Sequence, residues 1–171
     1  GEGIALARGR AETCVVLVNP DNTLVAQVAA LGPDWIQLHG PETPHRVETI
    51  RDEAGIAVLK VCHIGSADDV AAVSAFADCA DRLMLEAKPP KDATRPGGLG
   101  VTFDWSLLKT LDPELGFMLS GGLKPANAAA AITAPRKMGL DDYSGVETAP
   151  GIKDAALIRA FITNARSAAA S

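Results

Sequence analysis

The segment Gly116-Phe-Met-Leu-Ser-Gly-Gly-Leu-Lys-Pro125 bears most directly on the fold class. A short apolar run ends in a Ser-Gly-Gly turn, and Pro125 then suits the first turn of a helix. Glycines let backbone N–H groups approach an anion, and a helix start favours negative charge. A plain strand-to-helix turn would look the same. However, a second turn, Ser144-Gly145-Val146-Glu147, follows the next apolar segment, and such a pair after the last two strands indicates the phosphate site of a βα barrel.

The same alternation of strand and helix patterns runs through the chain. Apolar runs bounded by turn residues predict buried parallel strands at 13–18, 35–38, 57–62, 82–85, 116–119 and, more weakly, 139–143. Helical patterns lie between and after them at about 22–31, 43–54, 66–77, 104–110, 125–133 and 153–168. Four of these begin at residues that commonly cap helix N-termini, namely Asp21, Thr43, Ser66 and Asp104. This rhythm is typical of an α/β fold.

Such units form either an open doubly wound sheet or a closed barrel. No Gly-x-Gly-x-x-Gly follows the first strand, so the signal of a dinucleotide-binding open sheet is missing. The two glycine turns after the last two strands favour the barrel. We therefore predict a TIM-type (βα)8 barrel, as a single incomplete domain over residues 1–171 with about six βα units present.

Composition excludes several classes of protein. The net charge of −5 at pH 7 argues against a nucleic-acid binder that neutralises phosphates, and no apolar run approaches the ~18 residues of a membrane span. The cysteines, Cys14, Cys62 and Cys79, are odd in number and widely spaced, which predicts neither a disulfide framework nor a zinc site. The three histidines show no metal-ligand spacing. Gly1-Glu2-Gly3 does not resemble a signal peptide, so we expect a reducing, cytoplasmic compartment.

Several polar residues lie on or beside the predicted strands. Glu86 follows an apolar strand, where a barrel keeps its catalytic groups, and it is either a general acid or a solvated strand-end carboxylate. Gln37 and His39 share one side of their strand and either line the barrel mouth or play a structural part. Lys60 interrupts a strand and needs a carboxylate partner, for which Glu86 and Asp141 are the candidates. Cys62 is best interpreted as a small buried apolar residue.

Taken in order, the motifs resemble one enzyme family. They are Val18-Asn-Pro-Asp21, Gln37-Leu-His-Gly40, Glu86-Ala-Lys-Pro-Pro-Lys-Asp92, Pro96-Gly-Gly98 with Phe103-Asp-Trp105, Leu119-Ser-Gly-Gly-Leu123, and Ser144-Gly-Val-Glu147 with Pro150-Gly-Ile-Lys-Asp154. The set is similar to the phosphoribosylanthranilate isomerases of tryptophan biosynthesis, from about Arg10 onward. Each block alone is modest, whereas the ordered set is highly specific.

The resemblance implies a (βα)8 barrel that catalyses the Amadori rearrangement of N-(5-phosphoribosyl)anthranilate to 1-(2-carboxyphenylamino)-1-deoxyribulose 5-phosphate. In this family a general acid protonates the ribose ring oxygen, and a general base removes the C2′ proton. The implied enzyme is a cytoplasmic aldose–ketose isomerase for a small phosphorylated substrate. It uses no cofactor and no metal, and it contacts neither nucleic acid nor membrane. A homodimer is compatible with the resemblance.

Matched position by position, the resemblance assigns roles to nine residues. Glu86 takes the place of the general acid. The phosphate would be held by Ser120, Gly121, Gly122, Ser144 and Gly145, while Gln37 and His39 line the pocket and Asp141 matches an aspartate of the last strand.

The chain also departs from the family pattern. The family acid is an aspartate, and the extra methylene of Glu86 shifts the carboxyl by roughly 1 Å, which is enough to cost about 10²-fold in rate. The family base, a cysteine in a Lys-Ile-Cys-Gly strand, has no counterpart here, and neither does the arginine expected near the second strand. Leu99, Asp142 and Tyr143 replace smaller or uncharged family residues, and Asp142 adds a carboxylate beside the phosphate turn.

These departures leave three interpretations. The chain is an isomerase that lacks the first two βα units in this sequence, or it is a truncated or degenerate non-catalytic homologue that retains a phosphate-binding site. A third possibility, another phosphate-binding barrel such as indoleglycerol-phosphate synthase, fits the last two turns. It does not fit Gln37-Leu-His-Gly40 or Glu86-Ala-Lys-Pro-Pro.

Overall fold

The computed structural model describes residues 2–89, 102–112, 114–133 and 137–170. The loop from Lys88 to Gly100, whose length and proline and glycine content leave open a lid, a binding loop or a surface excursion, lies outside the described residues from position 90 onward, and so does Leu99. Among the described residues, no helix has the length and apolar character needed to cross a membrane.

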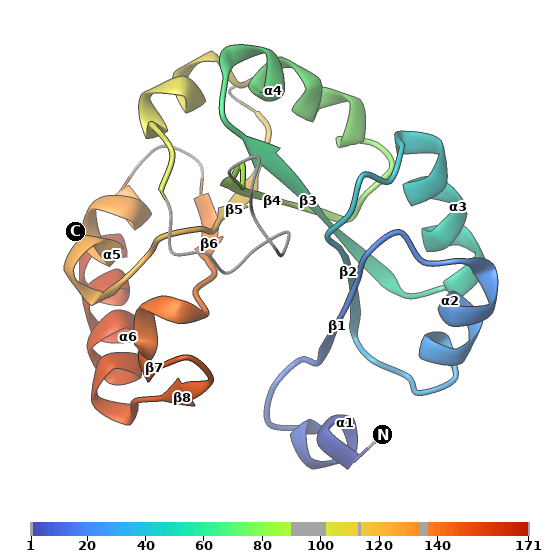
Figure 1. Ribbon diagram of the computed structural model, residues 1–171, viewed down its shortest axis with the longest axis horizontal. Helices are drawn as coiled ribbons and strands as arrows, with labels where there is room; N and C mark the ends of the chain where they lie inside the picture. The colour runs from blue at the N-terminus through green and yellow to red at the C-terminus, as the bar shows by residue number, and fades with distance from the viewer. Residues whose placement is uncertain (1, 90–101, 113, 134–136, 171) are drawn as a thin grey trace. The chain divides into compact units, whose positions relative to one another are not determined.

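Six strands form a parallel sheet whose order follows the chain (Figure 1). They are β1 (Cys14–Leu17), β2 (Trp35–Leu38), β3 (Ala57–Ile64), β4 (Arg82–Ala87), β5 (Phe117–Leu119) and β6 (Lys137–Leu140). The predicted α/β class and its six strands are thereby confirmed, although β6 begins and ends earlier than expected. Strands β3 and β4 run two residues past their predicted ends, so that His63 and Glu86 lie within strands.

The helical segments lie before, between and after the strands. The α-helices are α1 (Glu2–Ala7), α2 (Asn22–Ala29), α3 (Pro44–Ala54), α4 (Ala67–Ala72), α5 (Pro125–Thr133) and α6 (Ala155–Ala169). Three short 3₁₀ helices are η1 (Val73–Phe76), η2 (Trp105–Thr110) and η3 (Ser144–Val146). The predicted helix at 104–110 is therefore a 3₁₀ segment. All four predicted cap residues accept hydrogen bonds from backbone N–H groups two or three positions later.

The chain divides into two compact units, Gly1–Cys62 with Ala72–Leu83 and His63–Ala71 with Met84–Ser171. In the first unit β1, β2 and β3 pair in parallel register, with Leu17 opposite Leu38 and Leu38 opposite Lys60. Alternate residues of a strand share a face, so Ile36 and Leu38 point to one side and Trp35 and Gln37 to the other. Ile36 and Leu38 are fully buried, which marks their side as the packed face of the first unit.

In the second unit β4, β5 and β6 pair in parallel register. Leu119 of β5, Leu123 and Ala131 of α5 form a buried core cluster. Phe161 of α6 packs against that cluster, and Asn164 Nδ2 donates to the carbonyl of Pro125 at 2.8 Å, so α6 lies against α5.

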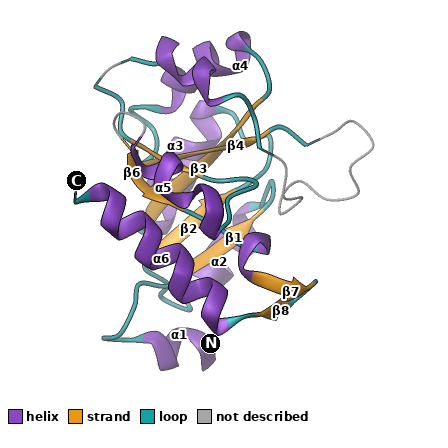
Figure 2. Ribbon diagram, turned by 90° about the vertical axis from the view of Figure 1, so that its left-hand side faces the viewer, coloured by secondary structure: helices purple, strands orange, loops and turns teal. Residues whose placement is uncertain are grey.

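A small antiparallel hairpin follows η3 in the second unit (Figure 2). It consists of β7 (Glu147–Ala149) and β8 (Ile152–Lys153), joined through Pro150 and Gly151. Gly151 has a φ of 80°, which a side chain would strain. The sequence prediction missed this hairpin, although the Pro-Gly dipeptide is a known turn signal.

Lys60 does form the expected buried ion pair, but the partner is Glu42 and not Glu86 or Asp141. Lys60 Nζ lies 2.8 Å from Glu42 Oε2, and the two side chains are 3% and 0% exposed. The strand register explains the difference: Lys60 is paired with Leu38 and shares its packed face. On that face its ammonium also lies 5.6 Å from the Phe76 ring centroid.

The pair also ties two loops together. Glu42 Oε1 accepts hydrogen bonds from the N–H of Asn19 at 2.7 Å and of Gly40 at 3.1 Å, while Lys60 Nζ donates to the carbonyl of Gly40. Burial disfavours the charged form of Glu42, but the hydrogen bonds from Lys60 and Asn19 outweigh burial and lower the pKa of the carboxyl. The turn after β1 and the turn after β2 are therefore held by one carboxylate.

Replacing Lys60 with Met should lower the free energy of unfolding by about 3–5 kcal/mol at neutral pH, because it leaves Glu42 as a buried carboxylate without its cation. In the wild type, the lowered pKa of Glu42 contributes stability above the unfolded carboxyl pKa of about 4.3, and this stability is lost as pH falls through the folded pKa. Urea titrations over this pH range measure both effects.

The matched control is Lys109→Met on the exposed side of η2, which should change stability by less than about 0.5 kcal/mol. Equal losses in the two variants would contradict the role of the buried pair.

Candidate functional site

The candidate residues of the first unit lie at the end of β2. Gln37 Nε2 and His39 Nδ1 are 3.1 Å apart, and both side chains are half-buried. Gln37 lies on the face of β2 opposite the packed face, and Cys14 Sγ of β1 is 3.9 Å from its Oε1. Because Glu42 fixes the N–H of Gly40, the residue after His39, the Lys60–Glu42 pair restrains this strand end.

In the second unit Glu86 is a buried carboxyl group, only 6% exposed, which excludes the interpretation as a solvated strand-end carboxylate. The side chain of His63 on β3 is 21% exposed, and its Nε2 lies 3.7 Å from Glu86 Oε2. A buried carboxyl beside an imidazole is a suitable arrangement for proton transfer. The sequence analysis placed His63 in a turn after its strand, so its proximity to Glu86 was not predicted.

The Ser120 turn is well ordered by its own hydrogen bonds. Ser120 is 5% exposed, and its Oγ donates to Asp141 Oδ2 at 2.9 Å. Gly121 and Gly122 have φ angles of 88° and 63°, so both glycines are required by the backbone. Asn127 Nδ2 of α5 donates to the carbonyl of Gly122 at 3.1 Å. The structure thus brings together the candidate residues that follow β5 and β6.

The second turn, Ser144–Gly145 in η3, packs against the first. A Cβ atom on Gly145 would lie 1.9 Å from the carbonyl oxygen of Leu123, the residue that follows Gly122. This close approach places the two glycine turns side by side. However, the N–H of Gly145 donates to Asp142 Oδ1 at 3.1 Å.

Charged side chains surround this second turn. Burial raises the pKa of Asp142, and Glu147 adds to the rise, while the N–H groups of Gly145 and Tyr143 and the charge of Lys153 oppose it. Lys153 Nζ lies 3.0 Å from Glu147 Oε1, 3.4 Å from the Tyr143 ring centroid, and donates to the carbonyl of Tyr143. The nearest cation is therefore already engaged by Glu147 and Tyr143.

Cys62 behaves as the sequence predicted. It is buried, and burial raises the pKa of its thiol to about 11. A thiol with so high a pKa is not a nucleophile or base near neutral pH.

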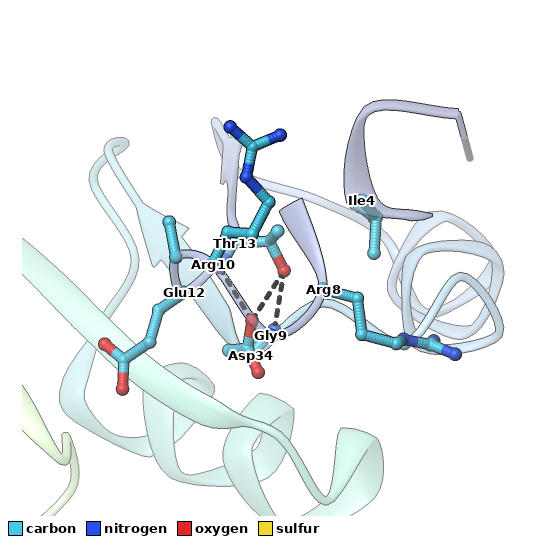
Figure 3. A pocket seen from close by; sticks show the side chains of 9 residues that line it. Ile4, Arg8, Gly9, Arg10, Glu12, Thr13 and Asp34 are labelled. Atoms are coloured by element: carbon cyan, nitrogen blue, oxygen red, sulfur yellow. Dashed lines mark hydrogen bonds between the residues drawn. The ribbon is translucent and has the colours of Figure 1, made fainter. Parts of the chain in front are cut away.

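A hollow of about 270 Å³ opens at the amino ends of the first two strands, lined by Arg8, Arg10, Glu12, Thr13 and Asp34 among others (Figure 3). The N–H and Oγ1 of Thr13 donate to Asp34 Oδ2 at 2.6 and 2.8 Å. These hydrogen bonds tie the residue before β1 to the residue before β2. In TIM-type barrels the catalytic groups lie at the carboxyl ends of the strands, whereas these hydrogen bonds lie at the amino ends.

Comparison with known proteins identifies the same family as the sequence motifs. The family model for "N-(5'phosphoribosyl)anthranilate (PRA) isomerase" matches residues 4–164. The chain belongs to the PRA isomerase family. An N-(5'-phosphoribosyl)anthranilate isomerase of Rhodopseudomonas palustris (strain HaA2) is 49% identical over 158 residues, which cover 92% of this chain and 72% of that protein.

Solved PRA isomerase structures share the fold. The Thermotoga maritima phosphoribosyl anthranilate isomerase superposes with a TM-score of 0.75 at 31% identity, covering 90% of this chain and 72% of that one. A second, at 28% identity with a TM-score of 0.71, covers 90% of this chain and 71% of that one, and was solved with reduced 1-(o-carboxyphenylamino)-1-deoxyribulose 5-phosphate. The predicted TIM-type fold is thereby confirmed for this member of the PRA isomerase family.

Replacing Gly145 with Ala should lower the free energy of unfolding by more than about 2 kcal/mol, because the new methyl group meets the rigid backbone carbonyl of Leu123. Thermal unfolding monitored by circular dichroism measures the loss. The matched control is Gly139→Ala on β6, where the new methyl group meets Met118 Cε at an ordinary 3.6 Å. A Gly145→Ala protein as stable as the control would show that the two turns do not touch.

Proposed function

We propose that this chain acts as an N-(5'-phosphoribosyl)anthranilate isomerase, an aldose–ketose isomerase of tryptophan biosynthesis. The observation that carries the proposal is the family match over residues 4–164, which includes both glycine turns and Glu86. The substrate is a small phosphorylated molecule, in keeping with the phosphorylated compound bound by one structural relative. The aspartate-to-glutamate change at position 86 keeps a carboxyl group, so the acid chemistry stays available.

In the proposed mechanism, Glu86 is the general acid that protonates the ribose ring oxygen. Its burial on β4 supports this role, because a buried carboxyl delivers its proton at a position that excludes bulk water. The imidazole of His63, 3.7 Å away, is suited to pass a proton taken from solvent to Glu86, which replaces the one that Glu86 gave to the ring oxygen.

The two adjacent glycine turns form the proposed phosphate site. Ser120, Gly121 and Gly122 contribute one side, and Ser144 and Gly145 contribute the other. Ser120 Oγ donates to Asp141 Oδ2 at 2.9 Å, and this hydrogen bond holds the first turn in place. Holding the phosphate positions the sugar for proton transfer and so contributes to the rate through orientation. Gln37 and His39 are proposed to line the substrate pocket.

The proposal extends to features that the comparisons leave open. The chain spans 72% of the Rhodopseudomonas relative, and the family's base-bearing Lys-Ile-Cys-Gly strand has no counterpart among the 171 residues. We infer that two βα units complete the (βα)8 barrel as a single domain.

A cytoplasmic location agrees with the three free cysteines. A homodimer is compatible with a relative described as dimeric in Thermotoga maritima.

The decisive experiment measures loss of phosphoribosylanthranilate fluorescence with the 171-residue chain, alone and joined to the first two βα units of the Rhodopseudomonas relative. Turnover in either form supports the isomerase. A folded chain that binds product but shows no turnover in both forms would favour the non-catalytic homologue.

In whichever form turns over, Glu86→Gln should lower kcat by about 10²- to 10⁴-fold, because the amide cannot donate the acid proton. The control Glu48→Gln, on the exposed side of α3, should retain activity. A Glu86→Gln enzyme with near wild-type kcat would remove Glu86 from the mechanism.

Ser120→Ala should raise KM by about tenfold with a smaller change in kcat, because the hydrogen bond from its hydroxyl to Asp141 holds the phosphate turn in place in both ground and transition states. Steady-state kinetics separate the two constants. Ser106→Ala on the exposed side of η2 is the control. A fall in kcat at unchanged KM would contradict the phosphate-binding role of Ser120.

A further inference from the structure

The second glycine turn carries an internal anion. Asp142 lies between β6 and η3, and its Oδ1 accepts the N–H of Gly145 at 3.1 Å. A phosphate oxygen held by the same N–H would need nearly the same position. The carboxylate and a bound phosphate therefore compete for one donor.

The second carboxylate oxygen has no such partner. Oδ2 of Asp142 is buried and makes no hydrogen bond within the described part of the chain. It is also the side-chain atom nearest to the position of a Cβ on Gly145, at 2.9 Å. A buried carboxylate oxygen without a donor is an unfavourable feature that a purely structural cap would not need.

The charges nearby do not neutralise Asp142. Lys153 of β8 is engaged by Glu147 at 3.0 Å and by Tyr143, and Glu147 of β7 is itself negative. An incoming phosphate would thus meet a carboxylate at its own binding turn, and two anions at this separation repel unless one is protonated or moves.

We propose that Asp142 sets the affinity of this turn for the substrate's phosphate by competing for the N–H of Gly145. The inference rests on the proposed function, because it takes the two glycine turns as the phosphate site. Neutralising or displacing the Asp142 carboxylate is a condition for tight phosphate binding. Substrate binding then becomes stronger as Asp142 takes up a proton.

Sulfate is the appropriate probe because it keeps its double negative charge while Asp142 titrates. Calorimetric titration of the 171-residue chain at about pH 8 should show that Asp142→Asn binds sulfate about tenfold more tightly than the wild type, since a neutral amide oxygen gives up the N–H of Gly145 more easily than a carboxylate does and does not repel the anion. As the pH falls from about 8 toward the raised pKa of Asp142, the wild-type affinity should rise toward that of the variant, which itself changes little.

Three controls keep the result specific. Asp52→Asn, on the exposed side of α3, makes the same change in net charge and should leave sulfate affinity unchanged. Asp142→Ala removes the charge and the hydrogen-bond acceptor together, so it shows whether tighter sulfate binding depends on the side-chain amide of Asp142→Asn. The backbone amide resonance of Gly145 should shift on sulfate addition, which locates the binding.

Equal sulfate affinities in wild type and Asp142→Asn, an equal gain in Asp52→Asn, or no sulfate binding in any variant would each overturn the inference. The isomerase assay separates this from the proposed function. Turnover without an Asp142 effect removes the inference alone, whereas tighter sulfate binding in Asp142→Asn without turnover removes the isomerase function alone.

Discussion

Parallel pairing of short strands is the constraint on which the rest of the structure depends. In each unit it sends successive turns to the same end of their strands, so that residues far apart in sequence meet. Ser120 and Asp141 meet in this way after β5 and β6, and the turns at Asn19 and Gly40 meet after β1 and β2. The candidate chemistry of this family member is a product of that pairing and not of any single contiguous motif.

Much of the fold could be predicted from the sequence, because apolar runs, cap residues and glycine turns reflect local burial and backbone preferences. The strands, the caps at Asp21 and Thr43, and helix α5 followed from such signals. The partner of Lys60 could not be predicted, because it depends on the register that sets Lys60 beside Leu38. The proximity of His63 to Glu86 was missed for a related reason. Strand ends depend on pairing with neighbouring strands, and β3 and β4 each extend two residues beyond their predicted ends.

In the two glycine turns, the requirements of packing and of anion binding oppose each other. Gly145 has no room for a side chain against Leu123, which keeps the turns together. The same turn holds the carboxylate of Asp142 where an anionic ligand needs a donor. In the proposed phosphate site, stability of the turn and affinity for the phosphate are therefore set against each other at a single N–H group.

Strand β1 has a consequence for how the chain behaves in concentrated solution. Among the described residues its only strand partner is β2, so its other edge presents unpaired backbone groups. Val16 on this strand and Val18 just after it are 54% and 53% exposed. An apolar strand with a free edge is a template for the strand of another molecule. Self-association of the 171-residue chain should therefore begin at β1, and a lysine at position 16 would be the simplest way to suppress it.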